Sequence, residues 1–478
     1  MQRNPLDNAG FIAYNTGMKM LNLTLLSVVA LCTPAMAQEP QPAPAAAEQQ
    51  ADAPLPPAVT EALAAMVREN HDDFYAVAGA VLDNGGLSKL QPYMEQAAAE
   101  GSPAAQLWLA RMALDKLTAA KADMVNAPTA KEARELVKQA ADKGYQPAVI
   151  EMSRLAGSGI GAPADEKEGL RLLMEACKAG NARARAAYLL VTGRLDGGKL
   201  DAPEIVSELK KNNFYLEEIV ASLQRDEAEA LKWMKRAAEH GSPRAAYTLF
   251  NVGNGLVNDT EARDYLQLAV SRHLPDAIAT LGVLQTVGDG TVCPIDTVAG
   301  LRRLEESVAL GYTPAAVTLA SVYQTEPQKY SAETVFSLYK NATELGELRA
   351  AVGYGYCLVT GRGCTADVPQ GLELLNKLAD AGMPYARIAL ADIYFNGTGV
   401  EPDLRRAVDE LGAAAGEGLP GTYSLMAALT ALGNAAAPAD ERRAAIYLKM
   451  AEEQGDSEAK AAYESVLADK AWHFLPLP

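Results

Sequence analysis

Apolar side chains recur along this chain at spacings of three and four residues, in short stretches that end at glycine. The clearest example runs from Asp367 to Asp403. This spacing is the apolar stripe of an amphipathic helix. The pattern predicts two helices joined by a tight turn at Gly382, and a Gly-x-Gly turn at Gly397 and Gly399 that ends the second helix. The apolar positions are Leu372, Leu375, Leu378, Ala379, Ala386, Ala389, Leu390, Ile393 and Tyr394.

The inter-helix turn recurs through most of the chain. Its positions are Gly101, Gly144, Gly180, Gly241, His273 in place of glycine, Gly311, Gly346, Gly382, Gly418 and Gly455. Successive intervals are 43, 36, 61, 32, 38, 35, 36, 36 and 37 residues. A period of this size is typical of a helical solenoid, in which each unit packs only on its neighbours. We therefore predict an all-α solenoid of about ten two-helix repeats over residues 90–469.

One unit has a more specific resemblance. The segment from Asp226 to Leu256 resembles the Sel-1-like repeat family, which is related to the tetratricopeptide repeat. The residues that carry the resemblance are Ala230, Leu231, Trp233, Ala237, Ala238 and Gly241. The resemblance extends over about residues 90–469. It implies a right-handed superhelical solenoid that acts as an adaptor or assembly scaffold, often outside the cytoplasm. The chain departs from the family pattern at His273, and in the loops of the Gly311 and Gly418 units, which lack Gly-x-Gly.

The longest interval, between Gly180 and Gly241, exceeds the period by 25 residues. The extra residues lie around residues 197–225, where the apolar pattern predicts an inserted helix or helix pair. Insertions in solenoids lie on one face and often distinguish one partner from another. The insertion is therefore either a recognition element or a patch for a local change of curvature.

Residues 1–37 have the features of a signal peptide. Lys19 precedes an apolar run over residues 21–31, and the run is followed by Ala35-Met36-Ala37, the small-x-small pattern of a cleavage site. We expect an exported protein, periplasmic or secreted. The run is too short for a membrane span and no later segment is longer, so we do not expect an integral membrane protein.

The polar residues before this run favour a translation start at Met18 or Met20 as an alternative to Met1. Cys32 offers a lipoprotein interpretation, but Leu31 stands where a small residue is expected. Cleavage after Ala37 is the preferred interpretation.

Three further segments flank the predicted repeats. Residues 38–57 are rich in proline and alanine and predict a disordered leader. Residues 58–89 predict an N-terminal capping helix, because a solenoid must cover its exposed end. Residues 470–478 are a C-terminal cap or, alternatively, a docking tail.

Charge and side-chain types narrow the function. The net charge of −17 argues against nucleic acid and anionic membranes as partners. The four histidines are far apart, so no zinc set is visible. The Gly-x-Gly segments follow helices rather than strands, which favours helix stops over phosphate loops. We predict no catalytic residue, cofactor site or metal site. The histidines are His71, His240, His273 and His473, and the glycines are Gly157, Gly159, Gly288, Gly290, Gly361, Gly363, Gly397 and Gly399.

Four cysteines follow the predicted cleavage site. Cys357 and Cys364 lie seven residues apart, at the end of a second helix and in the following turn. Two interpretations stay open, a disulfide between them or two free or buried thiols. The resemblance implies a cysteine-rich branch whose helices are joined by disulfides, but Arg185 stands where the partner of Cys177 belongs. Cys293 occupies a turn too far along the repeat array to pair easily with Cys364.

These features lead to three functional hypotheses. The first is an exported, non-enzymatic scaffold of the bacterial cell envelope that binds a protein or peptide on a concave solenoid surface. The second is a glycan- or cell-wall-acting enzyme or binding protein with carboxylates converging from successive repeats. The third is a secreted effector that binds a host protein. The repeat itself singles out neither binding residues nor an oligomeric state.

Overall fold

The computed structural model describes residues 90–193, 200–252, 259–287, 292–456 and 459–469. The predicted signal peptide, leader, N-terminal capping helix and C-terminal tail lie outside these residues. The described part of the chain holds 22 α-helices and no β-strand. It divides into two units, residues 90–312 and residues 313–469, and each is described by itself.

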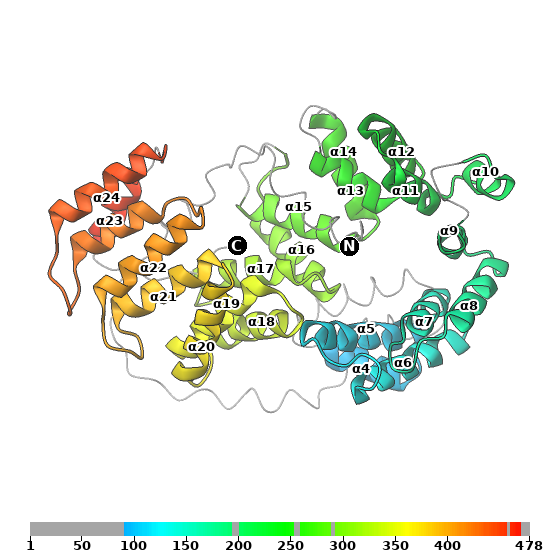
Figure 1. Ribbon diagram of the computed structural model, residues 1–478, viewed down its shortest axis with the longest axis horizontal. Helices are drawn as coiled ribbons and strands as arrows, with labels where there is room; N and C mark the ends of the chain where they lie inside the picture. Colours follow the sequence, from blue (N-terminus) through cyan, green and yellow to red (C-terminus); the bar gives the residue numbers. More distant parts are fainter. Residues whose placement is uncertain (1–89, 194–199, 253–258, 288–291, 457–458, 470–478) are drawn as a thin grey trace. The chain divides into compact units, whose positions relative to one another are not determined.

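Within each unit most successive helices pack on one another, although α9 packs more on α11 than on the intervening α10, and each even-numbered helix is the first of a repeat (Figure 1). The first unit contains α4 (Leu90–Ala99), α5 (Pro103–Ala119), α6 (Pro128–Asp142), α7 (Gln146–Ser158), α8 (Glu166–Lys178), α9 (Ala182–Val191), α10 (Pro203–Lys210), α11 (Phe214–Leu223), α12 (Glu227–Glu239), α13 (Pro243–Val252), α14 (Asp259–Ser271), α15 (Pro275–Val287) and α16 (Thr297–Ala309). The second contains α17 (Pro314–Thr325), α18 (Ala332–Glu344), α19 (Leu348–Thr360), α20 (Val368–Asp380), α21 (Pro384–Asn396), α22 (Leu404–Gly416), α23 (Thr422–Leu432), α24 (Glu441–Glu453) and α25 (Ala459–Asp469). The predicted all-α repeat solenoid is confirmed.

The turn between the two helices of a repeat requires a left-handed residue. The nine glycines predicted for this turn have φ between 80° and 97°. At Gly382 the N–H donates to the carbonyl oxygen of Ala379 at 3.0 Å, and the N–H of Met383 donates to that of Leu378 at 3.0 Å. This pair of bonds is a Schellman motif, which satisfies the last carbonyl groups of the first helix.

The segment predicted as an insertion contains the helix pair α10 and α11, and its turn is that of a repeat. Asn212 lies between the two helices with φ 56°, and the N–H groups of Asn212 and Asn213 donate to Leu209 and Glu208 at 3.2 and 3.4 Å. Asn213 then caps α11, as Asn181 caps α9. The interval of 61 residues is therefore two short repeats of 32 and 29 residues, with asparagine in the glycine position.

His273 occupies the turn between α14 and α15 with φ 55°. This backbone costs a non-glycine residue about 1–2 kcal/mol. We expect His273→Gly to raise the free energy of unfolding by about 0.5–1 kcal/mol, since glycine also loses more chain entropy on folding. Urea denaturation checks this, with His273→Ala as the control, which keeps the unfavourable φ. An equal gain in both variants would contradict the explanation.

The loop that ends a second helix folds back onto the start of its own repeat. Gly361 and Gly363 both have positive φ, and a Cβ on Gly363 would lie 2.1 Å from the carbonyl oxygen of Ala332 in the first turn of α18. Gly161 has the same relation to Ala130 of α6 at 2.5 Å. The second glycine of each pair is thus required by close backbone approach.

Some predicted helix stops differ in detail. Gly157 lies inside α7, and the left-handed pair there is Gly159 and Gly161, one Gly-x-Gly step later than predicted. Gly288 and Gly290 lie outside the described residues. The loop after α23 lacks the pair and instead turns at Gly433, where the side chain of Asn434 accepts bonds from two backbone N–H groups.

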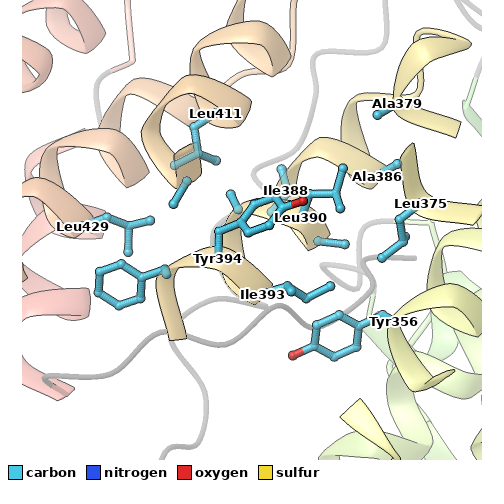
Figure 2. Packing of buried hydrophobic residues seen from close by; sticks show 14 of the residues in the cluster. Tyr356, Leu375, Ala379, Ala386, Ile388, Leu390, Ile393, Tyr394, Leu411 and Leu429 are labelled. Atoms are coloured by element: carbon cyan, nitrogen blue, oxygen red, sulfur yellow. The ribbon is translucent and has the colours of Figure 1, made fainter. Parts of the chain in front are cut away.

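The core of the second unit centres on the second helices. Along α21, nine residues are buried, whereas α20 and α22 each keep an exposed polar face. Figure 2 shows Tyr394 amid this cluster, with Leu411 and Leu429 to one side and Leu375 and Tyr356 to the other. The first helices therefore supply most of the solvent-facing side chains of this unit.

Candidate binding pocket and buried ion pairs

A pocket of about 480 Å³ lies in the second unit, where α20, α21 and α22 meet the loop before α22. This volume is within the range of sites that hold small ligands or side chains. The loop is fixed by a hydrogen bond from the N–H of Asp403 to the carbonyl oxygen of Tyr394 at 2.7 Å. The lining residues are Leu372, Asn376, Tyr394, Val400, Glu401, Pro402, Asp403 and Arg406.

An aromatic ring and a cation form one wall of this pocket. Tyr394 is only 4% exposed, and burial raises the pKa of its hydroxyl. The guanidinium carbon of Arg406 lies 3.9 Å from the centre of the Tyr394 ring, a cation–π contact. A guanidinium stacked on an aromatic ring in this way contacts it through its face, so its N–H edges can still donate to a ligand.

The charged groups of the pocket are not paired with each other. Asp403 caps α22, because its Oδ1 accepts the N–H of Arg406 at 3.0 Å. Arg406 and Glu401 are exposed, and among the described residues neither side chain forms an ion pair. By contrast, the neighbouring Arg405 lies 3.9 Å from Asp409. The pocket thus holds two opposite charges that remain open to a ligand.

The repeat does not dictate these lining residues. Thirty-six positions earlier, the equivalents of Tyr394, Glu401 and Arg406 are Leu358, Thr365 and Gln370. The loop geometry is nonetheless shared, since Asp367 N–H donates to Leu358 O at 2.8 Å. The preceding repeat therefore lacks the aromatic and charged lining, whereas the following repeat has an arginine, Arg443, at the position of Arg406 but Thr430 at that of Tyr394.

In the first unit a buried carboxylate joins α11 to α12. Glu217 is 0% exposed, and its carboxylate accepts a hydrogen bond from Nε of Arg236 at 2.7 Å. The Nδ1 of His240 lies 2.7 Å from the other oxygen. Because a buried charge is stable only when it is paired, these contacts fix the packing of the two helices. His240 thus has a structural partner.

A family model decides what these repeats are. The Sel1 repeat model matches residues 129–145, 147–181, 215–242, 348–383, 384–409 and 426–456. The chain belongs to the Sel1-repeat family. The matched segment 215–242 covers α12 and all but the first residue of α11, so the second helix of the pair first predicted as an insertion belongs to the Sel1 array.

Two curated proteins are similar to part of this Sel1-repeat chain. An uncharacterized protein of Neisseria meningitidis serogroup B is 25% identical over 354 residues, which are 71% of this chain and 64% of that protein. The chitin synthase regulator SKT5 of Saccharomyces cerevisiae is 24% identical over 295 residues, 58% of this chain and 38% of that protein. The chain thus spans less than two thirds of the length of these relatives.

Solved structures of Sel1-repeat proteins also align with it. A protective antigen present in uropathogenic Escherichia coli strains, which displays an SLR fold, covers 85% of both chains at 16% identity with a TM-score of 0.42. A Sel1 repeat protein from Oxalobacter formigenes covers 49% of this chain and 96% of its own at 19% identity, with a TM-score of 0.39.

A second buried polar contact links successive Sel1 repeats. The hydroxyl of Tyr356 donates to Oδ2 of Asp392 at 2.6 Å, and Asn396 donates to the other oxygen at 2.7 Å. Tyr356 and Asp392 occupy the same repeat position, 36 residues apart. Burial, followed by the charge of Asp392, raises the pKa of Tyr356. This contact joins α19 to α21. Both carboxylate oxygens of Asp392 are engaged in hydrogen bonds within the core.

Three carboxyl groups of the Sel1 array have raised pKa values because burial disfavours their charged form: Asp115, Glu218 and Asp276. Each also lies near an arginine, whose charge opposes the shift. Within the described ranges, no three histidine, cysteine or acidic side chains are grouped to hold a metal ion. No described helix has the length and apolar character needed to cross a membrane.

The four described cysteines are free, so of the two interpretations left open for Cys357 and Cys364 the structure contains the free thiols and not the disulfide. Cys357 lies on α19 and is buried, with only 4% of its surface exposed. The thiol of Cys364 instead donates to the carbonyl oxygen of Cys357 at 3.5 Å. The local fold-back that the sequence suggested is present, but it brings together a thiol and a backbone carbonyl.

The two thiols are expected to differ in reactivity. Burial raises the pKa of Cys357 to about 12, so only about one molecule in ten thousand carries the reactive thiolate at pH 8. We expect iodoacetamide to alkylate Cys364 at least about 100-fold faster than Cys357 in the native chain, and both at similar rates in denaturant. Peptide mass spectrometry measures both rates. Equal native rates, or protection of both thiols, would contradict this expectation.

Proposed function

We propose that this Sel1-repeat chain is an exported, non-enzymatic scaffold of the bacterial cell envelope that binds a protein or peptide partner. Sel1 repeats, like the related tetratricopeptide repeats, generally mediate protein–protein interaction. Export is supported by the apolar run over residues 21–31 and the cleavage pattern that ends at Ala37.

The observation that carries the proposal is the pocket beside Tyr394. It sits on a rigid two-helix frame that every repeat shares, while its aromatic and charged lining departs from the equivalent residues of the preceding repeat. Binding sites combine such a fixed frame with a few convergent polar groups. This volume suits a side chain or a short segment of a partner better than a flat partner surface.

The arrangement of carboxylates supports a role without catalysis. Glycan cleavage requires two carboxyl groups that face each other across a substrate groove, one of them with a raised pKa. The three described carboxyl groups with raised pKa values each have an arginine nearby. The charge of that arginine opposes the rise in pKa, which works against a role as general acid at these positions.

The proposal is tested by in-cell cross-linking of a tagged chain, followed by affinity capture and mass spectrometry. We expect one envelope protein at near-stoichiometric yield, and the mature chain in the periplasmic fraction. A strain whose Ala35 and Ala37 are replaced by bulky residues serves as the control for export, since it should retain the precursor. Recovery of the chain in the cytoplasm, or of no protein above background, would overturn the scaffold proposal.

A further inference from the structure

The pocket beside Tyr394 is lined by two open charges of opposite sign and by apolar side chains. Arg406 projects from the first turn of α22, and Glu401 projects from the loop that precedes it. Leu372, Val400 and Pro402 supply the apolar part. A ligand that fills this pocket must therefore satisfy a cation, an anion and an apolar surface together.

The lining favours a ligand that carries both charges over a ligand of a single sign. Glu401 and Asp403 both line the pocket, and the chain carries a net charge of −17. A polyanion would be repelled by these carboxylates, although Arg406 would attract it. A polycation would be attracted by Glu401 and Asp403 but would leave Arg406, which lies over the Tyr394 ring, without an anionic partner. A ligand with both charges meets a complementary group for each of them.

We propose that this pocket docks a partner segment in which an apolar side chain is flanked by one acidic and one basic residue. The acidic side chain pairs with the N–H edge of Arg406, which its stacking on Tyr394 leaves accessible. The basic side chain pairs with Glu401, and the apolar side chain lies against Leu372 and Val400. This specificity deepens the proposed scaffold function by naming the chemistry of its partner.

The test is selection of a random displayed peptide library on the immobilised mature chain. We expect enriched peptides to carry an acidic, an apolar and a basic residue in close succession. Arg406→Glu should lower recovery of these peptides about 10-fold and should shift enrichment toward peptides with two basic residues. Arg405→Glu is the matched control, because it makes the same change on the adjacent residue, which is 88% exposed and outside the pocket.

Several results would overturn the inference. They are enrichment of peptides that lack either charge, equal loss of binding in the Arg405→Glu and Arg406→Glu variants, and the absence of any enriched sequence. Circular dichroism of both variants confirms that the fold is kept. In-cell capture of the same envelope partner by the Arg406→Glu chain would retain the scaffold function and reject this pocket as its docking point. Enrichment of the expected peptides without any partner captured in cells would support the pocket specificity and reject the scaffold function.

Discussion

The Gly363→Ala substitution is expected to destabilise the second unit by about 4 kcal/mol or more. Gly363 has φ 72°, which alone costs an alanine about 1–2 kcal/mol. In addition, the new Cβ would lie 2.1 Å from the carbonyl oxygen of Ala332 and 2.8 Å from the backbone nitrogen of Glu333. Both are backbone atoms at the start of α18, so the loop must detach from its own repeat to relieve the overlap.

Hydrogen exchange and thermal unfolding measure this effect. We expect amides in the first turn of α18 and in the loop over residues 361–367 to lose protection first. Gly382→Ala is the control, because its φ of 81° is equally unfavourable but no atom lies within 4 Å of the added Cβ. It should cost only about 1–2 kcal/mol. Similar losses in the two variants would show that the contact with Ala332 carries little energy.

The Arg236→Met substitution should lower the free energy of unfolding by about 2–3 kcal/mol. It leaves the fully buried Glu217 with the His240 ring as its only side-chain partner among the described residues. Removing one member of a buried pair costs about 3–5 kcal/mol, and the lower value here reflects the 40% exposure of Arg236. The measurement is urea denaturation followed by far-ultraviolet circular dichroism.

The double variant Arg236→Met with Glu217→Leu separates the two causes of this loss. Replacing both members of a buried pair by apolar residues is often nearly neutral. We therefore expect the double variant to recover most of the stability. If it is as unstable as the single variant, the loss comes from packing of Arg236 against Trp233, 5.1 Å away, and not from the unpaired carboxylate.

Glycine made most of the architecture predictable from the sequence. The turn between two helices needs a left-handed residue, and glycine fills it without a steric cost, so its period marks the repeats directly. The same reasoning missed the turn at Asn212. Asparagine is the residue next best suited to this backbone, and Asn213 provides the same cap as Asn181. A search for asparagine in the glycine slot would have found the extra repeat.

The pocket was not predictable in the same way. The sequence places Tyr394 in an apolar stripe, and the residue is indeed buried. Nothing in the sequence distinguishes Arg406 from any other solvent-facing helix residue. Their meeting depends on the angle at which the loop before α22 returns across α21, which no local pattern encodes. The free state of Cys357 has a similar origin, because the spacing to Cys364 gives proximity but not the direction of either side chain.

The asparagine turn also has a consequence for how such an array changes in length. Gly180 is followed by the cap Asn181, and Asn212 is followed by the cap Asn213. Excising residues 181–212 would therefore join Gly180 to Asn213 and recreate a glycine–asparagine junction between α8 and α11. The chain would shorten by one module with both flanking helices intact. A single in-frame loss or gain of 96 nucleotides at this junction would thus alter the number of modules without creating a new sequence at the seam.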